Sequence, residues 1–135
     1  MLCIHPHDWR RNVPIVRSLD APTFDLQGSI VTGLASPQRG ATETMTYKVS
    51  LPPNGSLPPH RHDHEEVFYL SAGSLTAVLD GREFAVELGD SVIIPAGVLH
   101  HSFAGERQAE LIVAMPSGTA FIRPDGDRGV PPWGT

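Results

Sequence analysis

Apolar and polar residues alternate along several short stretches of the chain, which is typical of β-strands with one buried face. The clearest case is residues 42–51. Because neighbouring residues of a strand point to opposite faces, the apolar side chains of this stretch share one face, namely those of Met45, Tyr47, Val49 and Leu51. Threonine, lysine and serine occupy the other face. We therefore predict a strand here whose apolar face is buried.

Further strands are predicted over residues 66–71, 74–79, 82–88, 91–94 and 109–115. The first two of these are expected to form a hairpin, with Ala72-Gly73 near its turn. Asp80-Gly81 is a strong signal for a second hairpin. Glycine and proline, 13 of each, separate the stretches, and no segment has sustained helical periodicity. The pattern predicts an all-β sandwich or barrel.

Composition narrows the class of protein. The chain has 135 residues, of which 40% are hydrophobic and 19% charged, as expected for one globular domain. A formal net charge of −5 argues against a nucleic-acid-binding surface. The single cysteine, Cys3, excludes an intrachain disulfide and suits a reducing compartment. No apolar run is long enough to span a membrane, and residues 1–12 lack the apolar stretch of a signal peptide. We expect a cytoplasmic protein with no nucleic-acid or membrane partner.

Three of the seven histidines stand at alternate positions just before the strand predicted at residues 66–71. In an extended chain His60 and His62 point to the same side. The Glu66 carboxylate could reach the same point if the chain bends between His62 and Glu66. Neutral imidazole nitrogens converging with a carboxylate oxygen are what a transition-metal ion requires. We interpret this stretch as half of a metal site.

A second stretch supplies a further ligand. Residues 89–101 read GDSVIIPAGVLHH, in which a predicted strand runs into the turn Pro95-Ala96-Gly97. Proline fixes φ and glycine can adopt a positive φ, so this turn can direct His100 back toward the first cluster. Three histidines and one glutamate leave coordination positions open for a substrate or dioxygen.

Together the two stretches resemble the paired motifs of the cupin superfamily. The first family motif is Gly, five residues, His-x-His, three or four residues, Glu, six residues, Gly. Here His60, His62, Glu66 and Gly73 match, while Gly55 lies one residue closer to His60 than the motif places it. The departure falls in a loop that can vary in length.

The second family motif is Gly, five residues, Pro-x-Gly, two residues, His, three residues, Asn. Gly89, Pro95, Gly97 and His100 match it at every spacing, and Ala104 replaces the asparagine. That asparagine is not a metal ligand in the family. The replacement therefore affects support around the site rather than the ligand set.

The resemblance implies a cupin double-stranded β-helix, which is a jelly-roll barrel. It implies a single cupin domain over residues 1–135, with a barrel core at about 42–115 and terminal extensions that pack on the barrel or on a partner. It also implies one divalent transition metal per chain, which could be Fe, Mn, Ni, Cu, Zn or Co. The implied metal ligands are His60, His62, Glu66 and His100.

Three functions are compatible with this resemblance. The leading expectation is a mononuclear metal-dependent dioxygenase acting on a small organic substrate. The second is a redox-neutral isomerase, lyase or cyclase acting on a sugar acid or a polyketide-like compound. The third is a non-catalytic protein that binds a small molecule. We also expect a homodimer, because cupins pair their barrels and because each end of the chain carries a tryptophan, Trp9 and Trp133.

The other histidines and one neighbouring glutamate are assigned no ligand role: His5, His7, His64, Glu65 and His101. His64 and Glu65 are expected at the surface or in a loop, and His101 is expected to face away from His100. Thr46 and Tyr47 lie on opposite faces of one predicted strand. The alternation leaves open which of these two faces the metal.

Overall fold

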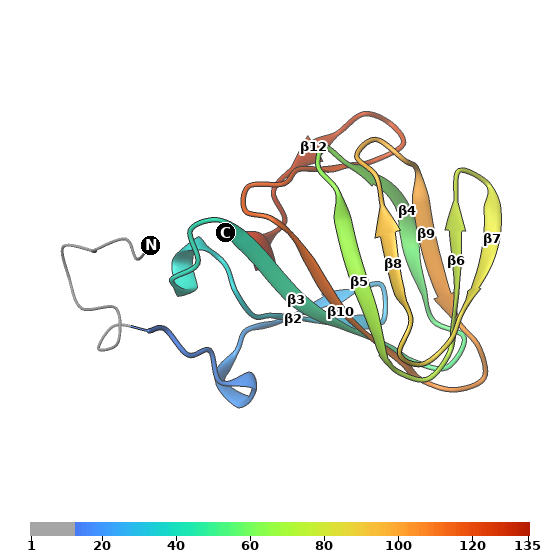
Figure 1. Ribbon diagram of the computed structural model, residues 1–135, viewed down its shortest axis with the longest axis horizontal. Helices are drawn as coiled ribbons and strands as arrows, with labels where there is room; N and C mark the ends of the chain where they lie inside the picture. Colours follow the sequence, from blue (N-terminus) through green and yellow to red (C-terminus); the bar gives the residue numbers. More distant parts are fainter. Residues whose placement is uncertain (1–12) are drawn as a thin grey trace, which may run out of the picture.

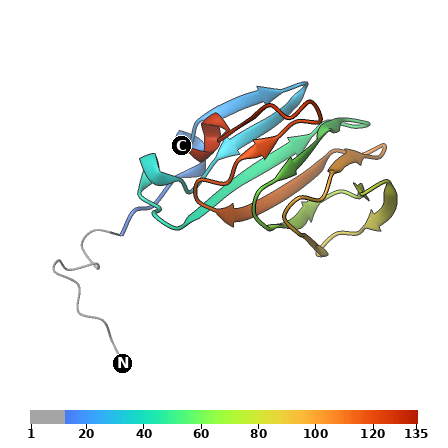
Figure 2. The ribbon, with the colours of Figure 1, turned by 90° about the horizontal axis from the view of Figure 1, so that it is seen from above.

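A computed structural model describes residues 13–135, which form two six-stranded antiparallel sheets (Figures 1 and 2). The first sheet has the spatial order β1-β2-β3-β10-β5-β8. Its strands are β1 (Thr23–Leu26), β2 (Ser29–Gly33), β3 (Thr44–Leu51), β10 (Ala109–Pro116), β5 (Glu66–Ala72) and β8 (Ser91–Ile94). The expectations for Cys3, His5, His7 and Trp9 fall outside the described residues.

The second sheet has the spatial order β12-β11-β4-β9-β6-β7. Its strands are β12 (Arg128–Gly129), β11 (Phe121–Ile122), β4 (Ser56–His62), β9 (His100–Ala104), β6 (Leu75–Leu79) and β7 (Arg82–Val86). From β3 to β11 the chain passes repeatedly from one sheet to the other. The prediction of an all-β jelly-roll barrel is confirmed.

The helices of the described part are single 3₁₀ turns, namely η2 (Ser18–Asp20), η3 (Pro37–Arg39) and η4 (Pro132–Gly134). Within residues 13–135, no helix has the length and apolarity that crossing a membrane would require.

The predicted hairpin between residues 66–71 and 74–79 is wrong. β5 pairs with β10 and β8, whereas β6 pairs with β7 and β9 in the other sheet. Gly73 lies between β5 and β6 with φ +76°, and a Cβ atom there would lie 2.1 Å from the carbonyl oxygen of Gln108. The backbone therefore changes sheets at a close crossing with residue 108, which local sequence does not distinguish from a tight turn.

The predicted hairpin at Asp80-Gly81 is confirmed. Leu79 pairs with Arg82 across a two-residue loop. Asp80 and Gly81 have φ values of 50° and 81°, as the favoured type I′ turn requires.

The predicted apolar face of β3 lies in the core between the sheets. Met45, Tyr47, Val49 and Leu51 are buried there, and alternate residues of β5 and β10 meet them. Burying each large apolar side chain contributes roughly 1.5–3 kcal/mol, so this shared face is a main source of stability. Because the two sheets pack against each other through this core, the ends of their strands have fixed positions relative to one another.

The C-terminal segment packs against the barrel beside β2 and β3 (Figures 1 and 2). Trp133 is buried, and its ring centroid lies 5.9 Å from Phe24, 5.7 Å from Tyr47 and 5.8 Å from Phe121. Arg39 donates from Nη2 to the Trp133 carbonyl oxygen at 2.9 Å and from Nε to the Leu34 carbonyl oxygen at 2.8 Å. This end of the described chain therefore lies on its own barrel.

Candidate metal centre

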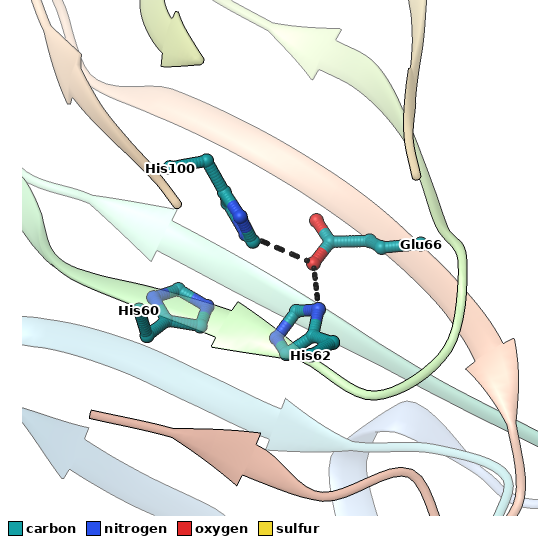
Figure 3. A group of neighbouring side chains, drawn as sticks. All are labelled: His60, His62, Glu66 and His100. Atoms are coloured by element: carbon teal, nitrogen blue, oxygen red, sulfur yellow. Dashed lines mark ion pairs between the residues drawn. The ribbon is translucent and has the colours of Figure 1, made fainter. Parts of the chain in front are cut away.

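Three strands bring the four predicted ligands together at one end of the barrel. His60 and His62 lie near the end of β4, and His100 begins β9, where it pairs with His60 across the sheet. Glu66 begins β5 and reaches across from the opposite sheet. Each residue offers one ligand atom, and these atoms all lie within 4.8 Å of one another. Figure 3 shows the four side chains pointing toward a common centre.

The turn before β9 holds this arrangement in place. Gly97 has φ +83°, a conformation that favours glycine, and its amide donates to the His62 carbonyl oxygen at 2.8 Å. The turn is therefore attached to the end of β4. As the sequence predicted, it returns the chain so that His100 lies beside the first cluster.

Hydrogen bonds orient two of the imidazole rings. His60 Nδ1 lies 2.8 Å from the Pro58 carbonyl oxygen, and His100 Nδ1 lies 2.9 Å from that of Val98. A carbonyl oxygen only accepts, so in both rings Nδ1 carries the proton and donates. When the ring is neutral, Nε2 is left with its lone pair. Metal-binding histidines are commonly oriented by such a backbone bond.

Several buried nitrogens of the cluster have no hydrogen-bond partner among the described residues. They are both ring nitrogens of His62 and Nε2 of His100. Glu66 Oε1 lies 2.9 Å from His62 Nδ1 and 3.5 Å from His100 Nε2, but these contacts lack hydrogen-bond alignment. Unpartnered buried polar atoms are costly, and a metal ion would satisfy them.

A small cavity adjoins these unpartnered atoms. Its volume is about 30 Å³, and its walls include His60, Glu66 and His100. That is room for one water-sized species. The donor atoms, their unpartnered state and the cavity together fit a metal ion.

The electrostatics of the cluster favour the protonation states that metal binding needs. Burial, and then the neighbouring His100, lowers the pKa of His60 to about 4. Burial alone would raise the pKa of Glu66, but the close His100 and His62 rings lower it to about 2. Burial opposes a charge on His100, yet its contact with Glu66 raises its pKa. Near neutral pH, His60 is therefore neutral and Glu66 is ionised, as metal ligands must be.

Three of the residues that are assigned no ligand role lie in the described part of the chain and outside this cluster, namely His64, Glu65 and His101. His64 and Glu65 are exposed, and His64 Nδ1 lies 2.8 Å from Asp63 Oδ1. The His101 ring lies beside that of Phe103, with the centroids 6.5 Å apart.

Two aromatic residues near the cluster could not be identified from the sequence. Phe121, in the two-residue strand β11, pairs with His62, and its ring stacks on His60 at 5.3 Å with an interplanar angle of 10°. Tyr47 faces inward, whereas Thr46 accepts at Oγ1 from the Ala35 amide at 3.1 Å. Burial, and then the charge of Glu66, raises the pKa of Tyr47. Only the strand alternation around Tyr47 gave a signal: it placed Tyr47 on the apolar face but left open whether this face meets the metal site.

A larger pocket also has His60 in its wall. Its volume is about 640 Å³, within the range of roughly 300–1,000 Å³ that small-molecule sites occupy. Strands β3 and β4, Phe121 and the C-terminal segment form its walls. The pocket is mainly apolar and aromatic where it approaches His60.

Comparison with known proteins identifies the family. The family model described as Cupin domain matches residues 47–115, about half of the chain. The chain belongs to the cupin family. No curated protein sequence matches this cupin.

Solved structures resemble this cupin over most of its length. The polyketide cyclase RemF from Streptomyces resistomycificus is 27% identical, with a TM-score of 0.70, and the match covers 77% of this chain and 79% of that one. KdgF from Halomonas sp. is 19% identical, with a TM-score of 0.66 and coverages of 76% and 91%. A predicted oxalate decarboxylase from Thermotoga maritima is 22% identical, with a TM-score of 0.60 and coverages of 74% and 96%. The last two likenesses show the fold alone.

Proposed function

We propose that this cupin is a metal-dependent enzyme that converts a small, largely apolar organic compound at the mouth of its barrel. One observation carries the proposal: His60 lines both the small cavity beside Glu66 and His100 and the 640 Å³ pocket. The proposed metal site and the proposed substrate pocket therefore share a wall.

Four residues would hold the metal: His60, His62, Glu66 and His100. This donor set accepts one divalent transition metal, and Fe, Mn, Ni, Cu, Zn and Co are all compatible with it. When bound, such an ion supplies Lewis-acid polarisation of a substrate oxygen or, if it is redox-active, activation of dioxygen. The backbone carbonyls of Pro58 and Val98 would keep the His60 and His100 rings in position. The apolar walls would exclude water from the bound compound.

The charges around the pocket argue against a phosphorylated substrate. Arg123 pairs with Asp127 at 3.0 Å, and Arg128 pairs with Asp63 at 2.9 Å. The arginines of this rim are therefore already matched by carboxylates. The walls nearer to His60 are aliphatic or aromatic, which suits a compound of polyketide type rather than a sugar phosphate.

A redox-neutral cyclase-type reaction is the chemistry that we place first. Its support is the pocket lining, together with the likeness to RemF, which is described as a polyketide cyclase. Dioxygenase chemistry is the second candidate, and the ligand set of three histidines and one carboxylate favours it, because imidazole suits iron and copper.

The test compares turnover in air with turnover without oxygen. Metal-loaded protein is incubated with polyketide-like phenols and β-ketones, and product masses and oxygen uptake are recorded. Redox-neutral chemistry predicts products without added oxygen and no oxygen uptake, while a dioxygenase consumes oxygen with turnover. If compounds that stabilise the metal-loaded protein are never converted, the enzyme proposal fails and a binding protein is the better description.

A further inference from the structure

Tyr47 stands in the wall between the small cavity and the larger pocket. Four residues line both spaces, namely Tyr47, Val49, Leu57 and His60. Val49 and Leu57 have no polar side-chain atom, and His60 is a proposed metal ligand. Among the described residues of this wall, Tyr47 is therefore the side chain left to exchange a hydrogen bond with a bound compound.

The position of Tyr47 is well defined. It lies in β3, in the middle of the first sheet, and only 4% of it is exposed. Its ring centroid lies 5.7 Å from Trp133 and 6.4 Å from Phe121. Tyr47 shares the small cavity with Glu66 and the larger pocket with Trp133. Tyr47 thus lies between the cavity that Glu66 lines and the aromatic wall of the larger pocket.

Trp133 brings a buried donor to the same place. Its Nε1 has no hydrogen-bond partner of standard geometry among the described residues, and the residue is 6% exposed. The indole N–H only donates, whereas a tyrosine hydroxyl both donates and accepts. If Tyr47 Oη accepts from Trp133, the Tyr47 proton is free to be donated to another oxygen.

The rings around the pocket define the shape of compound that it suits. Phe121 stacks on His60, and Trp133 lies 5.8 Å from Phe121 at an interplanar angle of 76°. Aromatic side chains pack best against flat rings, face to face with an offset or edge to face. A planar, conjugated compound fits these walls.

We propose that Tyr47 is a substrate-binding residue whose hydroxyl donates a hydrogen bond to an oxygen atom of a planar, conjugated compound. Phe121 and Trp133 hold the rings of this compound, and Trp133 also positions the Tyr47 hydroxyl. The inference deepens the proposed function and rests on it for the role of the pocket as the substrate site.

Binding of two probes tests this role. The probes are 1-naphthol and naphthalene, which share their ring system and differ by one oxygen. Wild-type protein is expected to bind 1-naphthol more tightly. Tyr47→Phe should weaken 1-naphthol binding roughly five-fold, as for the loss of one hydrogen bond, and should leave naphthalene binding unchanged. Equilibrium dialysis gives both dissociation constants.

Tyr69→Phe is the matched control, because Tyr69 is the other tyrosine of the chain and is exposed on β5. It should leave the binding of both probes unchanged. If Tyr47→Phe binds 1-naphthol as tightly as wild type does, with its fold and metal content intact, the inference is wrong. It is also wrong if wild type binds neither probe.

Trp133→Phe tests the positioning role, since it keeps a ring in the wall and removes the N–H group. It should weaken 1-naphthol binding and spare naphthalene, and equal loss for both probes would contradict positioning. Metal content is measured on every sample. A chain that binds no metal but shows the Tyr47-dependent preference would refute the proposed function and leave the Tyr47 inference standing.

Discussion

At the residue scale, the candidate metal centre depends on which ring nitrogen of each histidine faces its middle. The Nδ1 atoms of His60 and His100 are occupied by backbone carbonyls, so their Nε2 atoms are free to bind. His101, the next residue along β9, has its ring beside Phe103 instead. Two adjacent histidines of one strand therefore have different surroundings.

This difference gives a direct test of the ligand assignment. His100→Ala should lower metal affinity at least 10-fold, because it removes one of four ligands, which is more than the loss expected from disturbing a residue that only supports a ligand. His101→Ala should keep the wild-type affinity. Affinity is measured by competition with a chromogenic chelator, and equal affinities in the two variants would overturn the assignment.

The charge state of His100 predicts how metal affinity depends on pH. Its contact with Glu66 raises its pKa, so below that raised value the ring holds a proton that a metal ion must displace. Affinity should therefore fall as the pH falls through this range, by up to about ten-fold per pH unit for this one proton. Competition titrations between about pH 5.5 and 8 measure the slope, and constant affinity would contradict the prediction.

The four candidate ligands could be predicted from the sequence because their placement follows from local rules. His60 and His62 are two residues apart on a strand, and a Pro-x-Gly turn precedes His100. Phe121 and the place of Tyr47 beside the candidate metal site could not be predicted in this way. Phe121 belongs to a two-residue strand and pairs with His62 of β4, which lies 59 positions earlier in the chain, and no local pattern encodes that pairing.

At the scale of strands and turns, the crossing between β5 and β6 has the strictest local requirement. Gly73 and Gly89 both have a positive φ, of 76° and 91°. A Cβ atom at Gly73 would lie 2.1 Å from the Gln108 carbonyl oxygen, whereas at Gly89 it would have nothing within 4 Å. The two glycines share one backbone constraint and differ in the space around them.

Alanine substitutions separate these two effects. Gly89→Ala should cost roughly 1–2 kcal/mol of unfolding free energy, from the left-handed backbone alone. Gly73→Ala should cost a further ~1–3 kcal/mol, because backbone atoms must move to make room. Urea unfolding followed by circular dichroism measures both, and equal midpoints for the two variants would contradict the crossing described here.

Strands with a clear alternation, such as β3, were predictable because one of their faces is buried along its whole length. The partner of each strand was less predictable. Ala72-Gly73 and Asp80-Gly81 both look like turns, but only the second joins paired strands. The first is a change of sheet, and its course depends on the distant residue Gln108.

At the scale of the whole molecule, assembly into a homodimer stays a prediction. One of the two reasons for this prediction, the tryptophan near each end of the chain, is weaker in the structure, because Trp133 is buried against its own chain. The other reason, the pairing of barrels in the family, is unchanged. Light scattering should give twice the chain mass, and a species of 14.6 kDa at working concentration would contradict the prediction.

The metal content of protein purified without an affinity tag or chelator tests the central claim most directly. We predict close to one equivalent of a divalent transition metal per chain. The reasons are the unpartnered nitrogens of His62 and His100, the ionised Glu66 and the adjoining cavity. A chain that carries no metal and takes up none on titration with iron, manganese, nickel, copper, zinc or cobalt would contradict it.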